Sequence, residues 1–342
     1  MRSWWKSALV GTLGVSFVVA PIWFGASEAM AVAATPVPPA SKPPAGSPGQ
    51  GLEISPPVLE LNANPGQKVT VQIRVRNVTT GVLIAKGKAD DFGAGSDESG
   101  QPKLLLDETG ATRFSLKYWV SNVPDLQLAP QELKTTTITI TVPSNAEPGG
   151  HFGVVRFTAV PPDLNGTGVA LSASVGTLVL MKVSGPITDK LSVAQFSTGS
   201  ITKAGLGWLD KTFFEQGPVD FLVRSRNEGS VHEKPKGDIT VTNMFGKKSK
   251  PLVVNQTGGN VLPDSIRRFE STFKDKGLFG YYTAALNLTY ANNQTLSAQT
   301  TFWVLPWKMI LLVMIGLIVI VALLRFGLKR YNDWIISQAR RR

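Results

Sequence analysis

The chain has 342 residues, a formal net charge of +11, no cysteine and two histidines. Without cysteine it forms no disulfides or thiolate metal sites, so its folded parts depend on hydrophobic cores of sufficient size. Residues 305–342 carry +6 of the net charge, whereas residues 34–304 carry only +4. The basic character therefore belongs largely to the C-terminal end, and it does not indicate a nucleic-acid partner.

The N-terminus has the three-part layout of a secretory signal. Arg2 and Lys6 precede an apolar run, Ala8–Phe24, and small residues follow at Ala29, Ala31 and Ala33. We expect residues 1–33 to be a signal peptide cleaved after Ala31 or Ala33. The alternative is an uncleaved membrane helix, which Pro21 within the apolar run disfavours. Residues 34–51 are rich in proline, alanine, glycine and serine and predict an extended linker.

From Leu52 onward the sequence predicts short strands. Apolar residues alternate with polar ones in Val69–Val75 and again in 137–142, which is typical of strands with one buried face. A hairpin is predicted from the alternation in Tyr282–Tyr290, the turn residues Asn292-Asn293 and the alternation in Leu296–Phe302. No stretch before residue 305 keeps a helical period for long, so the predicted class is all-β.

Two landmarks recur in the same order. Val71–Asn77 and Phe221–Asn227 both end in Arg-x-Arg-Asn, and the segments 150–153 and 277–280 both have the pattern Gly-x-Phe-Gly. This repetition favours two related β-domains. We therefore expect two tandem antiparallel Ig-like β-sandwiches, residues 52–190 and 191–304, followed by a single transmembrane α-helix.

The run Met309–Leu324 carries no charge, and flanking apolar residues extend it, which predicts a membrane-spanning helix over residues 305–328. Residues 329–342 are basic and predict a cytoplasmic tail, which leaves the two sandwiches extracellular. Aromatic and basic side chains flank the run and are the expected membrane-interface residues: Trp303, Trp307, Lys308, Arg325, Lys329 and Arg330.

Several short motifs occur within this layout: Pro56-Pro57 at the first strand, Asn64-Pro65-Gly66 before an alternating strand, Arg76-Asn77 after it, and Gly149-Gly150 before a closing strand. Together they resemble the WxL-interacting protein family of bacterial surfaces. That resemblance implies a first domain that binds peptidoglycan and a second that binds host or partner proteins. The first half is also similar to periplasmic pilus chaperones, which are another sandwich family.

Little in the chain suits catalysis. His151 and His232 are far apart in sequence, and none of the common hydrolase, zinc-protease or phosphate-loop motifs occurs. We expect no enzyme activity and no cofactor. The acidic segment 90–98 contains Asp90, Asp91, Asp97 and Glu98. A calcium loop is one interpretation, but the spacing does not match an EF-hand, and a solvated loop is favoured.

Two other segments are candidate binding sites. Alternation in 114–120 predicts a strand that places Lys117 and Trp119 on its polar face, where the Trp119 ring is available to stack on a sugar or to bury in a partner. The alternative, which we favour, is that Trp119 packs against the second domain or a covering loop. Lys247, Lys248 and Lys250 form a basic turn, interpreted as a soluble hairpin tip rather than a site for teichoic acid or lipid headgroups.

The features together predict a membrane-anchored bacterial surface protein that binds cell-wall polymer (peptidoglycan) or another surface protein through loops and strand edges. The rival hypothesis is an envelope assembly factor that uses an open sheet edge, as chaperones do. A long unpaired apolar edge in the first sandwich would favour the assembly factor, whereas edges blunted by lysine, proline or bulges would favour the scaffold.

Overall fold

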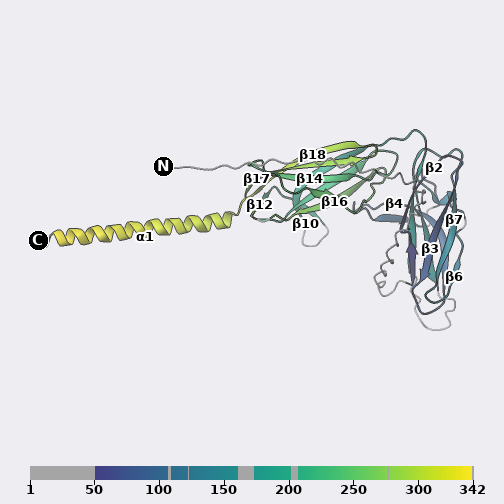
Figure 1. Ribbon diagram of the computed structural model, residues 1–342, viewed down its shortest axis with the longest axis horizontal. Coiled ribbons are helices and arrows are strands. Elements are labelled where there is room, and N and C mark those ends of the chain that lie inside the picture. Colours follow the sequence, from purple (N-terminus) through teal and green to yellow (C-terminus); the bar gives the residue numbers. More distant parts are fainter. Residues whose placement is uncertain are drawn as a thin grey trace, which may run out of the picture. The chain divides into compact units, whose positions relative to one another are not determined.

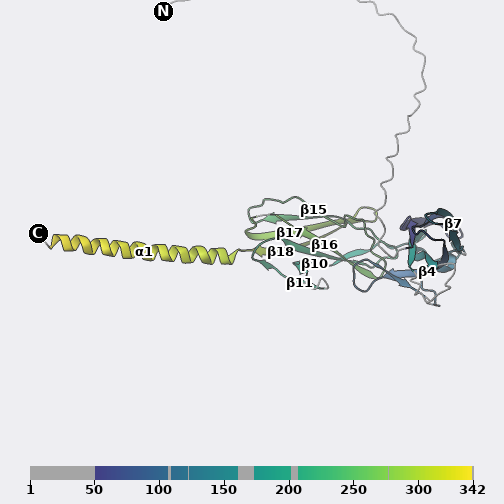
Figure 2. The same cartoon turned by 90° about the horizontal axis from the view of Figure 1, so that it is seen from below.

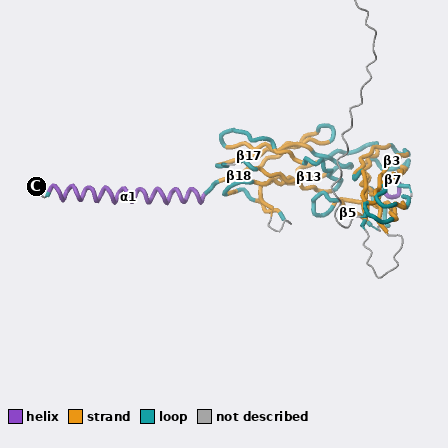
Figure 3. The backbone as a smooth tube through the Cα atoms, turned by 60° about the horizontal axis from the view of Figure 1, so that its bottom comes forward, coloured by secondary structure: helices purple, strands orange, loops and turns teal. Residues whose placement is uncertain are grey.

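The computed structural model describes residues 51–340, except for residues 107–108, 122, 161–172, 202–206 and 276. The predicted signal peptide, and the predicted linker apart from Gly51, lie outside the described residues. What is described consists of strands in two sandwiches and one long helix, shown in orange and purple in Figure 3.

The first sandwich has two facing sheets (Figure 1). The smaller sheet has the order β1-β3-β7, with β1 at Leu52–Ser55, β3 at Lys68–Asn77 and β7 at Leu133–Thr141. The larger sheet has the order β2-β9-β8-β4-β5, with β2 at Val58–Ala63, β9 at Ser174–Val183, β8 at Gly149–Val160, β4 at Leu83–Ala94 and β5 at Pro102–Leu105; β6, Leu126–Leu128, also pairs with β4. All pairs are antiparallel except β2 with β9.

The core of the first sandwich follows from alternation along its strands. In β3 the side chains of Val71, Ile73 and Val75 are buried while the residues between them face solvent. Val71 pairs with Ile138 of β7, so both strands turn their apolar sides to the same core. Both strands predicted from the sequence are therefore confirmed.

The second sandwich also has two sheets, and Figure 2 shows β15 and β17 in one layer with β10 and β11 in the other. The first sheet has the order β11-β10-β13-β16: Trp208–Asp210, Leu191–Ile201, Val219–Asn227 and Ser265–Phe273. The second has the order β12-β18-β17-β14-β15: Phe213–Phe214, Gln294–Val304, Gly280–Tyr290, Lys236–Asn243 and Leu252–Val254. Phe221 and Phe302 meet across the core with ring centroids 5.8 Å apart.

The predicted hairpin is confirmed as β17 and β18, which pair from Gly280↔Val304 to Tyr290↔Gln294. Ala291 and Asn293 in its turn have positive φ angles of 42° and 63°. Asparagine tolerates this left-handed conformation better than most residues, which explains why an Asn pair marks the turn in the sequence. The all-β class and the two Ig-like sandwiches predicted from the sequence are thus present.

The repeated Arg-x-Arg-Asn motif has a structural basis. Asn77 ends β3 and Asn227 ends β13, and both side chains are fully buried. The Asn77 amide donates to the carbonyls of Gly81 (2.7 Å) and Ala129 (2.9 Å). The Asn227 amide donates to those of Val231 (2.7 Å) and Val261 (2.8 Å). In each sandwich the asparagine satisfies buried backbone groups of two loops that would otherwise lack partners.

The C-terminal helix α1 extends over Trp307–Ala339 and is long and apolar enough to cross a membrane. Two residues separate it from β18, which ends at Val304. The helix continues beyond the predicted membrane span, residues 305–328, through the basic segment as far as Ala339. The limits of the span stay a prediction. Lysine, arginine, glutamine and alanine are good helix formers, and no proline interrupts them.

Candidate functional site

Salt bridges and hydrogen bonds join the two sandwiches. The Arg224 guanidinium binds both carboxylate oxygens of Glu98, with Nε to Oε2 at 2.7 Å. The backbone N–H of Arg268 donates to the carbonyl of Glu98 at 2.8 Å, so the acidic segment is held by backbone and side chain together. A further ion pair joins Arg113 to Asp264.

A second group of contacts joins β2 to the loops of the second sandwich. Lys234 Nζ donates to Glu60 Oε1 at 2.7 Å, and Asn260 Nδ2 donates to the same oxygen at 2.9 Å. These bonds lower the pKa of Glu60 against the opposing effect of burial, which is the largest influence on it. Leu262 of the second sandwich packs on a small apolar cluster of the first that includes Phe92 and Leu180.

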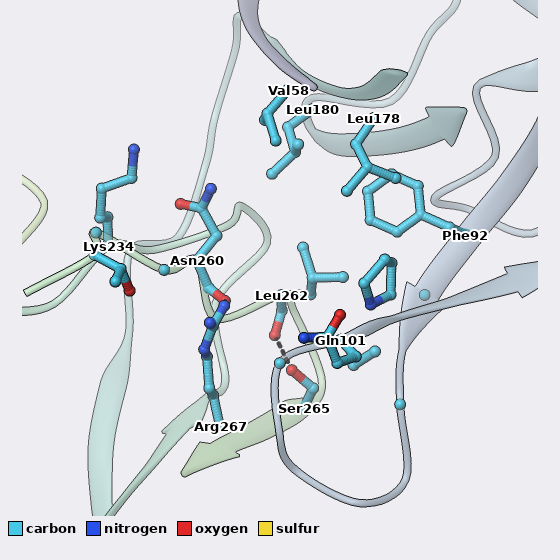
Figure 4. A pocket seen from close by; sticks show the side chains of 18 of the residues that line it. Val58, Phe92, Gln101, Leu178, Leu180, Lys234, Asn260, Leu262, Ser265 and Arg267 are labelled. Carbon is cyan, nitrogen blue, oxygen red and sulfur yellow. Dashed lines mark hydrogen bonds between the residues drawn. The ribbon is translucent and has the colours of Figure 1, made fainter. Parts of the chain in front are cut away.

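A pocket of about 430 Å³ lies among these contacts (Figure 4). One wall is apolar and comes from strands β2, β4 and β9, with Val58, Phe92, Leu178 and Leu180. The opposite wall comes from the second sandwich and includes Lys234, Asn260 and Arg267. A concave site with one apolar wall and a few convergent polar groups is typical of ligand-binding sites.

Arg267 is the most unusual residue of the pocket. Its Nη1 donates to the carbonyl of Asn260 at 2.8 Å, but its Nε is buried and has no partner among the described residues. No carboxylate in the described part of the chain forms an ion pair with it, and burial lowers its pKa. The side chain is half-buried, and its guanidinium lies 5.6 Å from the centre of the Phe269 ring. A partly desolvated cation without a counter-ion is unfavourable, so an anionic ligand there would be stabilised.

Two glycines make room for the guanidinium. A Cβ atom added at Gly100 or Gly259 would lie 2.2 Å and 2.3 Å, respectively, from atoms of Arg267. Gly100 comes from the first sandwich and has a φ of +78°, which glycine adopts without strain. The Arg267 guanidinium therefore lies directly against both glycines, and a side chain at either position would require it to move.

Strand β2 supplies an exposed backbone edge beside the pocket. It lies at the end of its sheet, pairs with β9 alone among the described strands, and presents Val58 and Glu60 to the pocket. Its other face, with Leu59 and Leu61, packs on the first core. An unpaired strand edge can accept another strand through backbone hydrogen bonds. Alternation in Val58–Ala63 is visible in the sequence, but its edge position is not.

The strand predicted for 114–120 is wrong. Lys117–Trp119 form a single 3₁₀ turn, because Asp91 Oδ1 accepts hydrogen bonds from the backbone N–H groups of Leu116 (2.9 Å) and Lys117 (2.8 Å). These bonds take N–H groups that a strand would use for pairing. Leu116 is fully buried as a result.

Trp119 and Lys117 make intramolecular contacts. The Trp119 ring lies 4.2 Å from that of His151 and packs on the first core. The Lys117 side chain is only 12% exposed, with its ammonium 3.8 Å from Asp91. Trp119 also lines a separate small pocket that shares no lining residue with the pocket at Arg267. A ligand role for Trp119 and Lys117 stays a prediction.

The solvated-loop interpretation of segment 90–98 is wrong for three of its four acids. Asp90 and Asp91 are buried in β4, and Asp90 binds Arg156 at 2.8 Å. Glu98 binds Arg224, and only Asp97 lies on an exposed turn. Among the described residues, no group of three potential metal ligands occurs. Residues distant in sequence supply the partners, so local composition did not reveal this arrangement.

The junction also contains titratable groups that sequence analysis did not connect. Burial lowers the pKa of His232, whose ring lies 5.8 Å from that of Phe152, to about 4. Burial, together with the nearby carboxyl of Asp189, raises the pKa of the adjacent Glu233 to about 7. The Glu233 backbone pairs with that of Val261, and His232 and Glu233 line a second pocket together with Glu60 of β2.

The predicted interface residues occupy the junction of β18 and α1 and the helix itself. Trp303 is half exposed and lies 5.1 Å from Tyr281, ring to ring. Lys308 Nζ binds Glu215 at 2.8 Å, close to the exposed Trp307. Arg325, Lys329 and Arg330 are exposed along α1. Their placement in a membrane interface stays a prediction.

Comparison with known proteins yields matches among solved structures only. No family model and no curated protein matches the chain. The class 5 fimbriae chaperone CfaA is 14% identical, with 73% of this chain and 98% of that chain covered and a TM-score of 0.37. The E. coli chaperone DraB is 12% identical, with 74% and 96% covered and a TM-score of 0.33.

The Salmonella enterica SafB chaperone in complex with the SafA pilin gives 12% identity, coverage of 74% and 96%, and a TM-score of 0.31. The chaperones named here are of the class that the first half of the sequence resembles, and no comparison supports the resemblance to the WxL-interacting family. At such values no residue role follows for this chain.

Proposed function

We propose that this chain is a membrane-anchored, non-enzymatic protein that binds an extended segment of a partner polypeptide in the pocket between its sandwiches. The observation that supports this most directly is Arg267, a half-buried cation at the edge of an apolar pocket. Among the described residues, its buried Nε has no hydrogen-bond partner and no carboxylate pairs with it. A carboxylate of the partner, either a chain terminus or an acidic side chain, would compensate that charge.

A polypeptide fits the surroundings of Arg267 better than a small anion does. The apolar wall, with Val58, Phe92 and Leu178, suits aliphatic side chains, and the free edge of β2 suits an added strand. Alternate side chains of such a strand would point into the pocket, while its backbone pairs with β2. Specificity would then come from the pocket and affinity largely from backbone hydrogen bonds.

The remaining edges of the first sandwich are poor acceptors for a longer strand. β1 and β5 have four residues each, and β7 exposes Lys134 and a row of threonines. Ser121 N–H also occupies the Thr139 carbonyl of β7 at 2.8 Å. Short or polar edges oppose strand pairing. We therefore favour capture of a short segment at β2 over the pairing of a whole folding subunit.

The helix α1 would hold this binding site at a membrane, with its basic C-terminal turns on the cytoplasmic side and the sandwiches outside. A surface or exported protein is the partner class that this orientation makes accessible. Binding of peptidoglycan remains a prediction that no feature of the pocket specifically favours, because sugar sites are typically lined by exposed aromatic rings.

The test uses the full chain in detergent and a fluorescent peptide of alternating valine and threonine that ends in a free carboxylate. Anisotropy should show saturable binding, and Arg267→Gln should weaken it about 10- to 100-fold, the effect of losing one charged hydrogen-bonding partner. Arg74→Gln, an exposed arginine on β3, is the matched control. The proposal fails if the peptide does not bind, or if both variants bind as well as the unmodified chain.

A further inference from the structure

One end of the second sandwich combines exposed apolar side chains with unpaired lysines. The turn after β14 exposes Phe245 to 80% and Met244 to 47%, and Phe279 just before β17 is 51% exposed. Lys247, Lys248 and Lys250 are exposed in the same segment, and no ion pair to them occurs in the described part of the chain. Large apolar side chains at this exposure mark interaction surfaces when they cluster.

Strand register places this turn at the end of the sheet where α1 begins. Asn243 of β14 pairs with Tyr282 of β17, and Tyr282 pairs with Phe302 of β18. The three residues therefore form one row across the sheet, and the turn lies two strands, about 10 Å, from β18. Beyond Phe302, β18 ends at Val304 and α1 begins at Trp307.

The connection between sheet and helix is short and held by hydrogen bonds. Leu305 N–H donates to the carbonyl of Phe214 at 2.8 Å, and Trp307 N–H donates to the carbonyl of Leu305 at 2.8 Å. Only Leu305 and Pro306 separate the last strand from the apolar helix. If α1 crosses a membrane, this end of the sandwich therefore lies next to the membrane surface.

The turn itself has a fixed conformation. Asn243 Oδ1 accepts from the backbone N–H groups of Phe245 (3.1 Å) and Lys247 (2.9 Å), and Gly246 has a φ of +79°. Gly246 N–H also donates to the Asn243 carbonyl at 2.9 Å. Phe245 thus lies at the tip of an ordered turn. Binding of its ring to another surface would therefore cost little additional conformational entropy.

The charge of the surface is positive. One carboxylate, Asp275, shares a small pocket with Lys247 and Lys248, while Lys250 adds a third positive charge. An aromatic residue at the tip of a basic turn is the pattern by which proteins bind the interface of an anionic bilayer, with the ring among the headgroups and lysines near the phosphates.

We propose that the turn 244–250 docks on the bilayer surface, with Phe245 in the interface and Lys247, Lys248 and Lys250 against anionic lipid headgroups. The inference rests on membrane anchorage by α1, as set out under Proposed function. A bilayer is favoured over a protein partner because the chain itself brings the membrane to this end of the sheet. Docking gives the protein a second membrane contact besides α1 and restrains the orientation of the second sandwich at the membrane surface.

The absence of cysteine makes single-site labelling direct. Phe245→Cys, Asn292→Cys and Ile318→Cys, each in the full chain, would carry an environment-sensitive fluorophore in vesicles of phosphatidylcholine and phosphatidylglycerol that contain spin-labelled lipid. Asn292 is the matched turn at the opposite end of β17 and β18, about 30 Å away along the strands. Ile318 lies within α1 and reports on the anchor.

We expect strong quenching at positions 245 and 318 and none at 292. If the label at position 318 is quenched while the label at position 245 is as weakly quenched as that at 292, the docking proposal is wrong but membrane anchorage by α1 is supported. If the label at position 318 is not quenched either, the docking proposal and the anchorage by α1 are both wrong. In the 245 variant, changing the three lysines to glutamine should reduce the docked-to-undocked ratio by about fivefold per lysine. Unchanged quenching, or equal quenching in phosphatidylcholine alone, would overturn the role of the lysines.

Discussion

Glu98 and Arg224, which are 126 residues apart, form a two-point salt bridge that joins the two sandwiches. Glu98 has a φ of 59°, a left-handed conformation that non-glycine residues seldom adopt, and Arg268 N–H binds its carbonyl. Contacts made by the second sandwich thus hold a strained turn of the first, and the same turn ends at Gly100 beside Arg267. The ion pair consequently helps to shape the pocket.

Glu98→Gln should lower the free energy of unfolding by about 1 kcal/mol, because both side chains of the pair retain partial solvent contact. The pKa of Glu98 is lowered chiefly by its hydrogen bond from Arg224, so its contribution is present above its ordinary pKa and is lost on acidification. Urea unfolding at several pH values measures both effects. Glu228→Gln, in an exposed pair with Lys190, is the control; equal losses in the two variants would contradict the expectation.

Asn77→Ala and Asn227→Ala should each lower the free energy of unfolding by about 2 to 3 kcal/mol, since each change leaves several buried backbone groups unsatisfied. Asn287→Ala, at an exposed position of β17, should cost less than about 1 kcal/mol. Chemical denaturation compares the three. A loss confined to only one of the buried asparagines would show that their roles are not equivalent.

His232 and Glu233 should impose opposite pH dependences on stability. The pKa of His232 is about 4, below its ordinary 6.5, so its stabilising contribution is present above 6.5 and is lost as pH falls toward 4. The pKa of Glu233 is about 7, above its ordinary 4.5, so its contribution is present below 4.5 and is lost as pH rises toward 7. In the unmodified chain the two trends partly cancel.

The two single variants separate these trends. With His232→Phe, stability should fall as pH rises from 4.5 to 7, whereas with Glu233→Gln it should rise with pH between 4 and 6.5. Thermal unfolding across this range is the measurement. Identical pH profiles for both variants and the unmodified chain would show that neither group titrates as its surroundings imply.

Trp119→Ala should lower the free energy of unfolding by about 3 kcal/mol, because the ring packs on His151 and on the first core. Tyr118→Ala should cost less than about 1 kcal/mol, since Tyr118 is largely exposed in the same turn. If Trp119→Ala unfolds like the unmodified chain yet loses binding to purified cell-wall sacculi, the ring serves a ligand and not the core.

Sequence alone predicted those elements whose signal is local. The alternation in β3, the hairpin of β17 and β18 and the helix α1 each appear within a short window, because burial of one face imposes a period on neighbouring residues. The Arg-x-Arg-Asn repeat likewise indicated two related domains before the roles of Asn77 and Asn227 were known. The same alternation also predicted a strand at 114–120, which is wrong because the distant Asp91 carboxylate accepts a hydrogen bond from the backbone N–H of Leu116.

The pocket depends on relationships that no window contains. Arg267 is unusual because Gly100 and Gly259 lie against it and no acid of the described residues pairs with it. Asp90, Asp91 and Glu98 each accept hydrogen bonds from residues that lie 25 to 126 positions away. Local composition determines which residues can be buried, but charge compensation and desolvation depend on which distant side chains arrive at the same place. The strands and the helix of this protein could therefore be predicted from local sequence patterns, whereas the proposed binding site depends on tertiary packing.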